Sequence, residues 1–312
     1  MRGPSSVLLE QAMYLVTDFG LLKMIHRVES GGHFFTDLLL FAEYTEMKRC
    51  LQDSRQNDMF DTHTHLDDRK FDPDREQIIQ TCFQNGVKYL VNIGTDLKSC
   101  QFSIELTQKH PQIYCTIAVH PHDSKLVNQQ TIAELDKLAQ NKKVVAIGEI
   151  GLDYYRMFSP KEDQIRAFKA QIELAFKLNL PIVYHVREAF DDTWKIILET
   201  KAFQLGGIMH SFSGAIEQAK KVTDLGLHIS FNGSLTYKNS LAQKVLPSVP
   251  EDLILVETDC PYLTPEPYRG KRNQPDYVKY VISKMAEILQ KSPLEVEKLT
   301  TRNALQAYRL KD

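Results

Sequence analysis

The sequence has 312 residues, of which 43% are hydrophobic and 25% are charged. This balance is typical of a globular protein with a large core, and it excludes disordered and fibrous chains. The formal net charge of -2 excludes a general basic field, so any nucleic acid would have to be bound by a local basic site.

Residues 1–58 do not fit the pattern of the rest of the chain. Residues 8–28 and 34–53 could each form an amphipathic helix, but Gly31 and Gly32 separate them, and residues 53–58 resemble a linker. We therefore expect residues 1–58 to be an N-terminal extension, helical or partly disordered, that is either appended to the main domain or not always translated. The main domain is expected to span residues 59–312.

From residue 59 onward, short runs rich in Val, Ile or Tyr alternate with longer amphipathic stretches. The runs span residues 59–65, 88–94, 114–120, 144–151, 181–186, 206–211, 228–234 and 253–259. The stretches between them are predicted helices, as in residues 164–180, where Ile165, Phe168 and Ile172 recur at helical spacing.

This alternation predicts parallel strands joined by crossover helices, because parallel neighbours need a long connection. Eight such units fit an α/β fold, a closed (β/α)8 barrel of the TIM type, for which ~250 residues is the usual length. An open doubly wound sheet is the structural alternative.

The ends of the predicted strands are rich in histidine and acidic residues. In a barrel these ends all lie at one face, where active sites are built. Five of the ten histidines fall there, whereas scattered core or surface histidines would have no reason to prefer the ends of four strands. The sequence therefore predicts a metal site. In chain order the strand ends carry His63, His65, His120, Glu149, His185, His210, Asn232 and Asp259.

The types of these residues narrow the chemistry. Imidazoles and carboxylates without a thiolate suit divalent Zn, Mn or Mg, and they are numerous enough for two ions that share a bridging carboxylate. Paired ions ~3.5–4 Å apart can bind both an attacking hydroxide and an oxygen of a phosphoryl or acyl group. A metal-activated water then needs no unusual side-chain base.

Seven motifs occur in chain order along the predicted barrel: "FDTHTHLD", "AVHPHD", "GEIGLDYY", "YHVREAFDDT", "HSFSG", "ETDCPYL" and "YRGKRNQP". Together they resemble the signature motifs of the TatD-type metal-dependent deoxyribonucleases of the amidohydrolase superfamily. The resemblance runs from about Met59 to the C-terminus and covers none of the first 58 residues. It implies a metal-dependent hydrolase barrel over residues 59–312.

The resemblance also implies a role for each strand-end residue. His63, His65 and Asp259 would hold one metal ion, His185 and His210 would hold the other, and Glu149 would lie between the two ions.

Asp259 is further expected to take the proton of the attacking water. His120 would contact the substrate or the attacked phosphate without being a firm ligand, while His122 is expected to be a capping or surface residue. Asp61 has the strand parity of His63, so it either orients a histidine or begins the strand, and we leave it outside the site.

A basic loop follows the last predicted strand and contains Arg269, Lys271 and Arg272. It is either a solvated charge cluster or a phosphate-binding loop, and its position after the final strand favours phosphate binding. Tyr154 and Tyr155, after the fourth strand, would either stack on bases or pack in the core.

The cysteines and the hydropathy indicate the cellular setting. The five cysteines are scattered and lack CxxC spacing, which argues against a disulfide framework and favours a reducing compartment. No apolar run approaches the ~20 residues of a membrane span, and Glu10 and Gln11 interrupt the N-terminal apolar stretch. We expect a cytoplasmic protein without a membrane partner. A monomer is expected, with an oligomer as the alternative.

The resemblance implies a metal-dependent 3′–5′ exonuclease that acts on single-stranded or frayed DNA ends, with RNA or tRNA as other possible partners. A D-aminoacyl-tRNA deacylase that uses the same metals is the alternative enzyme. A catalytically inactive binding or scaffold barrel is the alternative of another class, although every expected metal ligand is present in the sequence.

Overall fold

The computed structural model describes residues 58–311. The predicted N-terminal extension lies outside these residues, apart from Asp58. Among the described residues, no helix is long and apolar enough to cross a membrane.

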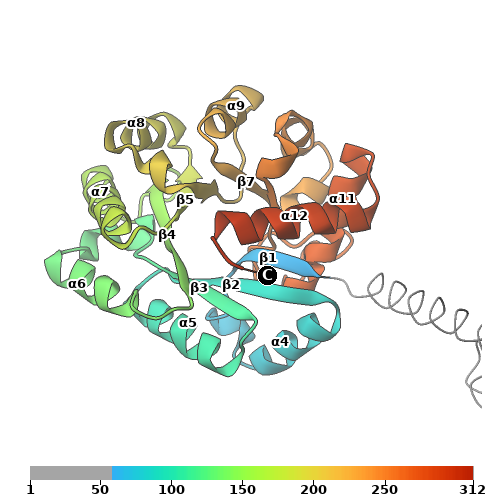
Figure 1. Cartoon of the computed structure of the whole chain (residues 1–312), viewed down its shortest axis with the longest axis horizontal. Helices are drawn as coiled ribbons and strands as arrows, with labels where there is room; N and C mark the ends of the chain where they lie inside the picture. Colours follow the sequence, from blue (N-terminus) through green and yellow to red (C-terminus); the bar gives the residue numbers. More distant parts are fainter. Residues whose placement is uncertain (1–57, 312) are drawn as a thin grey trace, which may run out of the picture. The chain divides into compact units, whose positions relative to one another are not determined.

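Eight parallel strands follow one another in the order of the sequence, each paired with the next (Figure 1). They are β1 (Met59–Thr64), β2 (Val87–Ile93), β3 (Ile113–Ile117), β4 (Val144–Asp153), β5 (Ile182–Arg187), β6 (Gly207–Met209), β7 (His228–Phe231) and β8 (Ile254–Val256). All eight predicted strands are therefore confirmed.

The first and last strands meet and close the ring. Thr64 pairs in parallel with Cys260, the amide of Asp259 donates to the carbonyl of His63, and the amide of His65 donates to the carbonyl of Cys260, both at 2.9 Å. The (β/α)8 barrel is thereby confirmed, and the open doubly wound sheet is wrong.

Helices surround the barrel on its outer side (Figure 1). The α-helices are α4 (Arg75–Gln84), α5 (Leu97–Lys109), α6 (Gln129–Leu138), α7 (Lys161–Leu178), α8 (Phe190–Thr200), α9 (Ile216–Asp224), α10 (Ala242–Val245), α11 (Val278–Leu289) and α12 (Pro293–Ala307). The 3-10 helices are η1 (Arg69–Phe71), η2 (Pro121–Leu126), η3 (Ala202–Leu205), η4 (Gly233–Thr236), η5 (Leu246–Ser248), η6 (Glu251–Leu253) and η7 (Pro275–Tyr277).

Short polar side chains fix where several of these helices begin. Asp96 accepts a hydrogen bond from the Ser99 amide at the start of α5, and Ser292 and Glu295 cap the start of α12 reciprocally. Such caps satisfy amide groups that have no partner inside the helix. The start of α5 after β2 and the start of α12 after α11 are therefore encoded locally.

The interior of the barrel is packed with apolar side chains from alternate strand residues. Examples are Phe60, Val183, Ile208 and Leu255, which are fully or almost fully buried and form one cluster with Tyr308, the residue after α12. A separate, larger cluster lies between the strands and the surrounding helices. Some polar side chains are also buried among the strands, and two of them, Thr62 and Ser230, are hydrogen-bonded.

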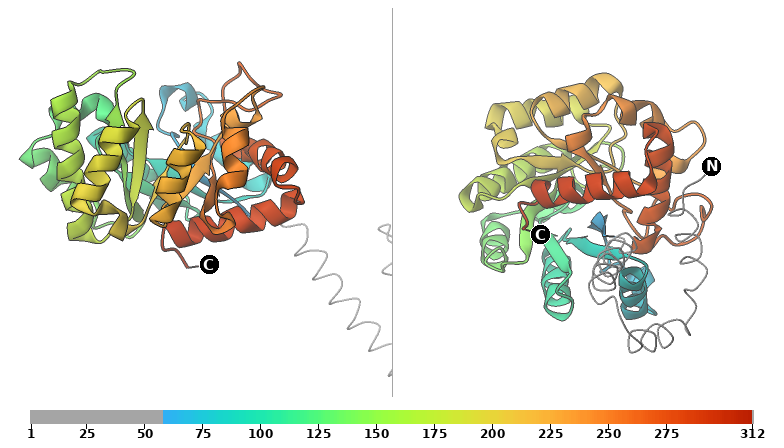
Figure 2. Two further views of the ribbon diagram at one scale, coloured as in Figure 1. Left: turned by 90° about the horizontal axis from the view of Figure 1, so that it is seen from above. Right: turned by 45° about the vertical axis from the view of Figure 1, so that its right-hand side comes forward.

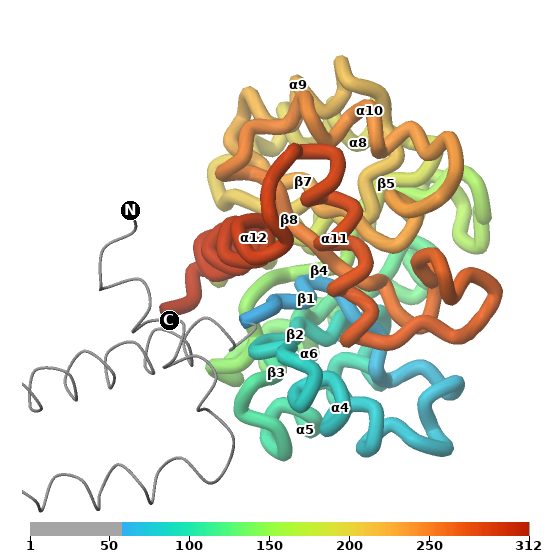
Figure 3. The backbone as a smooth tube through the Cα atoms, turned by 90° about the vertical axis from the view of Figure 1, so that its right-hand side faces the viewer, coloured from blue at the N-terminus to red at the C-terminus, as the bar shows by residue number. Residues whose placement is uncertain are grey.

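Helix α12 covers the end at which the strands begin (Figure 2, left; Figure 3). The Asn303 amide group donates to the carbonyl of Ile254 at 2.9 Å, the Thr301 hydroxyl donates to the carbonyl of Asp58 at 2.7 Å, and the Tyr308 hydroxyl donates to the carbonyl of Thr62 at 2.9 Å. Only the opposite end, where the strands finish, is left for a functional site.

We predict that a chain beginning at Met59 folds into the barrel, because the eight strands and their core lie beyond that residue. It should melt a few degrees below a matched chain that begins at Asp58, because Asp58 bonds to Thr301 and its amide donates to Glu297 at 2.7 Å. Thermal unfolding followed by circular dichroism compares the two chains. Insolubility of both would show that earlier residues are needed for folding.

Candidate metal centre

The centre is built first on the end of β1. The Nε2 atoms of His63 and His65 lie 3.2 Å apart, and the side chain of His63 is almost completely buried. The i, i+2 spacing in the sequence predicted that the two rings would point to one place, and the geometry agrees.

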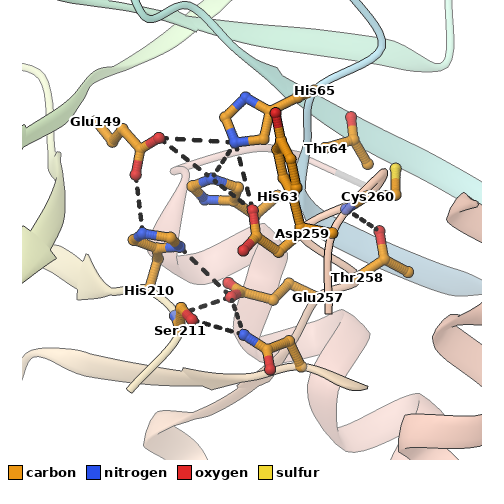
Figure 4. A network of polar contacts seen from close by, with 12 residues as sticks. His63, Thr64, His65, Glu149, His210, Ser211, Glu257, Thr258, Asp259 and Cys260 are labelled. Atoms are coloured by element: carbon orange, nitrogen blue, oxygen red, sulfur yellow. Dashed lines mark hydrogen bonds and ion pairs between the residues drawn. The ribbon is translucent and has the colours of Figure 1, made fainter. Parts of the chain in front are cut away.

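Glu149, in β4, faces several histidines, of which Figure 4 shows His63, His65 and His210. Its Oε1 atom is 3.8 Å from His63 Nε2 and 3.6 Å from His65 Nε2. Its Oε2 atom is 2.8 Å from His210 Nε2 and 3.2 Å from His185 Nδ1. Oε1 therefore faces the two histidines of the first motif and, also at 3.8 Å, His120, whereas Oε2 faces His185 and His210. This arrangement suits a carboxylate shared between two sets of ligands.

Asp259 and His120 complete the centre from either side. Asp259 Oδ1 lies 3.4 Å from His65 Nε2, and His63, His65 and Asp259 form one group of potential ligand atoms within 4.8 Å of one another. His120 Nε2 lies 3.8 Å from Glu149 Oε1. All the predicted metal ligands, together with His120, are thus gathered at one place.

Two carboxylates that the sequence analysis did not single out stand behind the histidines. Asp153 Oδ2 lies 3.2 Å from His185 Nε2, and Glu257 Oε1 lies 3.5 Å from His210 Nδ1. A carboxylate at the outer nitrogen of an imidazole fixes the ring and its tautomer, so that the other nitrogen is free to bind a metal. Glu257 could have been found from the sequence, because it lies two residues before Asp259 and so would point to the same side of an extended segment.

His122 also contacts Asp153, one of the two carboxylates behind the histidines. Its Nε2 atom lies 3.0 Å from Asp153 Oδ2, and its side chain remains about one-third exposed. The expected capping or surface role is therefore incomplete, because His122 shares a carboxylate oxygen with a predicted metal ligand.

Asp61 joins the ends of β1 and β8. Its carboxylate accepts hydrogen bonds from the amide and the hydroxyl of Thr258, at 2.9 and 2.6 Å, and from the amide of His63 at 3.3 Å. These contacts fix the backbone next to Asp259. Asp61 thus holds two ligand-bearing segments together without touching a histidine ring.

The centre favours an ionised Glu149. Burial alone would raise the pKa of Glu149, but the neighbouring His210 and His120 rings and the hydrogen bonds to His185 and His210 hold it well below its usual value. A charged carboxylate therefore remains at the middle of the site at neutral pH.

The histidines divide into two electrostatic classes. Burial opposes the charged form of His65, but Asp259 and Glu149 outweigh it and raise the pKa of His65 to about 9. The pKa of His210 is also raised well above its usual value against the effect of burial, chiefly by Glu149. Burial and nearby histidines lower the pKa of His63 and His120. A divalent ion would have to displace protons from His65 and His210 at neutral pH.

A pocket of about 500 Å³ opens beside His210. Tyr154, Val186, Phe190 and Phe212 are among the residues that line it. Its volume is within the usual range for small-molecule sites, so the centre has room next to it for part of a substrate.

The three basic residues of the predicted phosphate-binding loop have different surroundings. Arg272 is held by Asp74 through two contacts of 2.8 and 2.6 Å and donates to the carbonyl of Lys70. Arg269 is more exposed and lies over the ring of Tyr237, and Lys271 lies near the ring of Tyr268. Arg272 is thus occupied in anchoring the loop.

Comparison with known proteins shows what this chain is similar to. The profile of the family described as TatD related DNase matches residues 60–309. The metal-dependent hydrolase YabD of Bacillus subtilis is 40% identical over 253 residues, covering 81% of this chain and 99% of YabD. The 3′–5′ ssDNA/RNA exonuclease TatD of Salmonella typhimurium is 34% identical, with 79% of this chain and 97% of the relative covered.

Solved structures agree with the sequence comparison. The TatD homologue YJJV from Escherichia coli has a TM-score of 0.75 and 25% identity, covering 81% of this chain and 98% of its own. A TatD-family hydrolase from Entamoeba histolytica gives the same TM-score, identity and coverage.

We predict that Asp153→Ala weakens metal binding by about 10- to 100-fold, because the outer nitrogen of His185 loses the group that orients it. Asp153→Asn should be intermediate, since its amide oxygen can still accept. Calorimetric titration of the metal-stripped protein with Zn²⁺ measures this affinity.

Asp191→Ala, which removes an exposed carboxylate from α8, is the matched control and should bind the metal like the unchanged protein. Equal affinities in Asp153→Ala and in this control would contradict the orienting role.

Proposed function

This chain belongs to the TatD-related DNase family of metal-dependent hydrolases, and from that membership we propose that it hydrolyses phosphodiester bonds of DNA at single-stranded or frayed 3′ ends. The position of Glu149 between two histidine pairs is the observation that carries the proposal, because it suits a pair of divalent ions.

The residues present fit two ions of Mg, Mn or Zn. The first site would use His63, His65 and Asp259, the second would use His185 and His210, and Glu149 would bridge them. Imidazole nitrogens whose nearest polar neighbours are other ring nitrogens, such as the 3.2 Å pair of His63 and His65, are explained simply if a cation lies between them. No thiolate is present among these ligands, which is consistent with hard or borderline ions.

The proposed reaction divides its work among the side chains. When bound by these residues, divalent ions would supply positive charge to the reacting phosphoryl group and would make the attacking water more acidic. Asp259 accepts the proton of that water, His120 contacts the attacked phosphate, and Glu149 keeps the two ligand sets at a fixed separation. Asp153 and Glu257 orient the second pair of histidines from behind.

Nucleic acid as the substrate is supported by the relatives. The family is described as DNase, and the Salmonella relative is named as an exonuclease for single-stranded DNA and RNA with 3′–5′ polarity. RNA therefore enters the proposal as a second substrate. In the loop after β8, we assign phosphate contact to Arg269 and Lys271, while Arg272 supports them through its ion pair with Asp74.

We predict that Glu149→Ala loses bound metal and lowers activity by about a thousandfold or more, because both ligand sets lose their shared carboxylate. His110→Ala, which removes a histidine at the end of α5, should keep both metal and activity. Elemental analysis and a turnover assay on the same preparations test the pair. Full metal content with intact activity in Glu149→Ala would contradict the proposed centre.

A second prediction concerns the bond that is cleaved. The metal-loaded protein should shorten a 5′-labelled single strand of DNA from its 3′ end, and it should act more slowly on a blunt duplex and release no amino acid from D-aminoacyl-tRNA. Denaturing gels and an amino-acid release assay run in parallel separate the two reactions. Release of the amino acid without shortening of DNA would replace the nuclease with the deacylase.

A further inference from the structure

The loop after β4 exposes three large apolar side chains in succession. Tyr155, Met157 and Phe158 are 53%, 47% and 57% exposed. The other exposed large apolar side chains of the described chain are spread over several helices and loops. A cluster of solvent-exposed apolar side chains is typical of a binding surface.

This loop is connected to the metal centre by a short series of contacts. The ring of Phe158 packs edge-on against the ring of His122, with centroids 4.8 Å apart, and the ring of His122 lies 4.2 Å from that of His120. His120 in turn faces Glu149. The exposed aromatic surface therefore begins two rings away from the carboxylate at the middle of the centre.

Two arginines stand beside the exposed aromatic rings. The guanidinium of Arg187 lies over the ring of Tyr155 at 4.1 Å from its centroid, and that of Arg156 lies at 5.4 Å. Both arginines are exposed. Alternating aromatic faces and cations are the usual surface for a single nucleic-acid strand, whose bases stack while its phosphates meet the positive charges.

Tyr154 does not belong to this surface, although the sequence predicted the same two alternative roles for Tyr154 and Tyr155. Its hydroxyl donates to Asp192 at 2.8 Å, and the ammonium group of Lys161 lies 4.5 Å from its ring centroid. Tyr154 thus ties the loop to α8, whereas Tyr155 extends into solvent with the Arg187 guanidinium over its ring.

We propose that Tyr155 and Phe158 form a stacking platform for the bases next to the 3′-terminal phosphodiester, with Arg156 and Arg187 contacting the phosphates between them. This inference rests on the proposed nuclease function and names how its substrate is held. In a duplex each base is already stacked and paired within the helix, so the platform favours a single strand over paired ends.

Tyr155→Ala and Phe158→Ala test the platform in the full-length, metal-loaded protein. Each should raise KM for a 12-nucleotide single strand about tenfold, the usual loss for one stacked base, with kcat and metal content unchanged. On a strand whose last three 3′ nucleotides are abasic, the variants should match the unchanged protein. Tyr155→Phe should retain the lower KM, since it keeps the aromatic face.

Phe176→Ala is the matched control, because Phe176 is an aromatic residue of α7, 39% exposed, in the last turn of that helix. It should leave KM unchanged on both strands. Arg187→Gln tests the phosphate contact. In a plot of the logarithm of the binding constant for the single strand against the logarithm of the salt concentration, this variant should have a slope shallower by about 0.7 than the unchanged protein.

The outcomes separate this inference from the function on which it rests. If the unchanged protein shortens the strand and the alanine variants do so with the same KM, the platform is overturned and the nuclease stands. An equal loss on normal and abasic strands, or a loss of metal, would mean that the loop supports the centre and would also overturn the platform. Absence of cleavage by the unchanged protein would overturn both.

Discussion

The structure of the centre depends on one buried charge, the carboxylate of Glu149. A buried carboxylate is costly unless several groups of opposite charge or hydrogen-bond donors surround it. Here the partners are histidines in or just after β1, β3, β5 and β6, and the two oxygens face different sets of ring nitrogens. These segments reach one point because the barrel brings the ends of parallel strands into a ring. The fold therefore supplies the geometry that makes this charge tolerable, and a divalent ion on each side would neutralise it further.

Closure of the barrel and assembly of the centre are the same structural event. The amide of Asp259 donates to the carbonyl of His63, so the backbone bond that brings β1 to β8 also sets the distance between two proposed ligands. Asp61 reinforces this junction through Thr258. A barrel that opened here would lose one proposed metal site at once, so stability and function are coupled at the β1–β8 junction.

The sequence predicted the eight strands and the gathering of their terminal histidines, because alternation and strand parity depend only on residue spacing. It placed some strand ends too late: the third predicted run reached residue 120, whereas β3 ends at Ile117. The last residues of these runs leave the sheet to turn toward the centre. The sequence did not reveal Asp153 behind His185 or the pair of Arg272 and Asp74, because these contacts join segments whose lateral distance no spacing rule gives. The extension before residue 58 lies outside the described residues.

The substrate surfaces proposed here lie on opposite sides of the ring, and this placement constrains how a strand can bind. The aromatic platform follows β4 and the basic loop follows β8, and these two strands are separated by half of an eight-membered ring. A nucleic-acid strand that contacts both by the shortest path would cross the end of the barrel at which the proposed metal ligands gather. The proposed pair of divalent ions would not by itself distinguish a phosphoryl from an acyl ester, because both kinds of ester have an oxygen that such ions can polarise. Selection of a single-stranded nucleic acid would then depend on the loops after β4 and β8. The same barrel can support other hydrolytic activities when these loops differ.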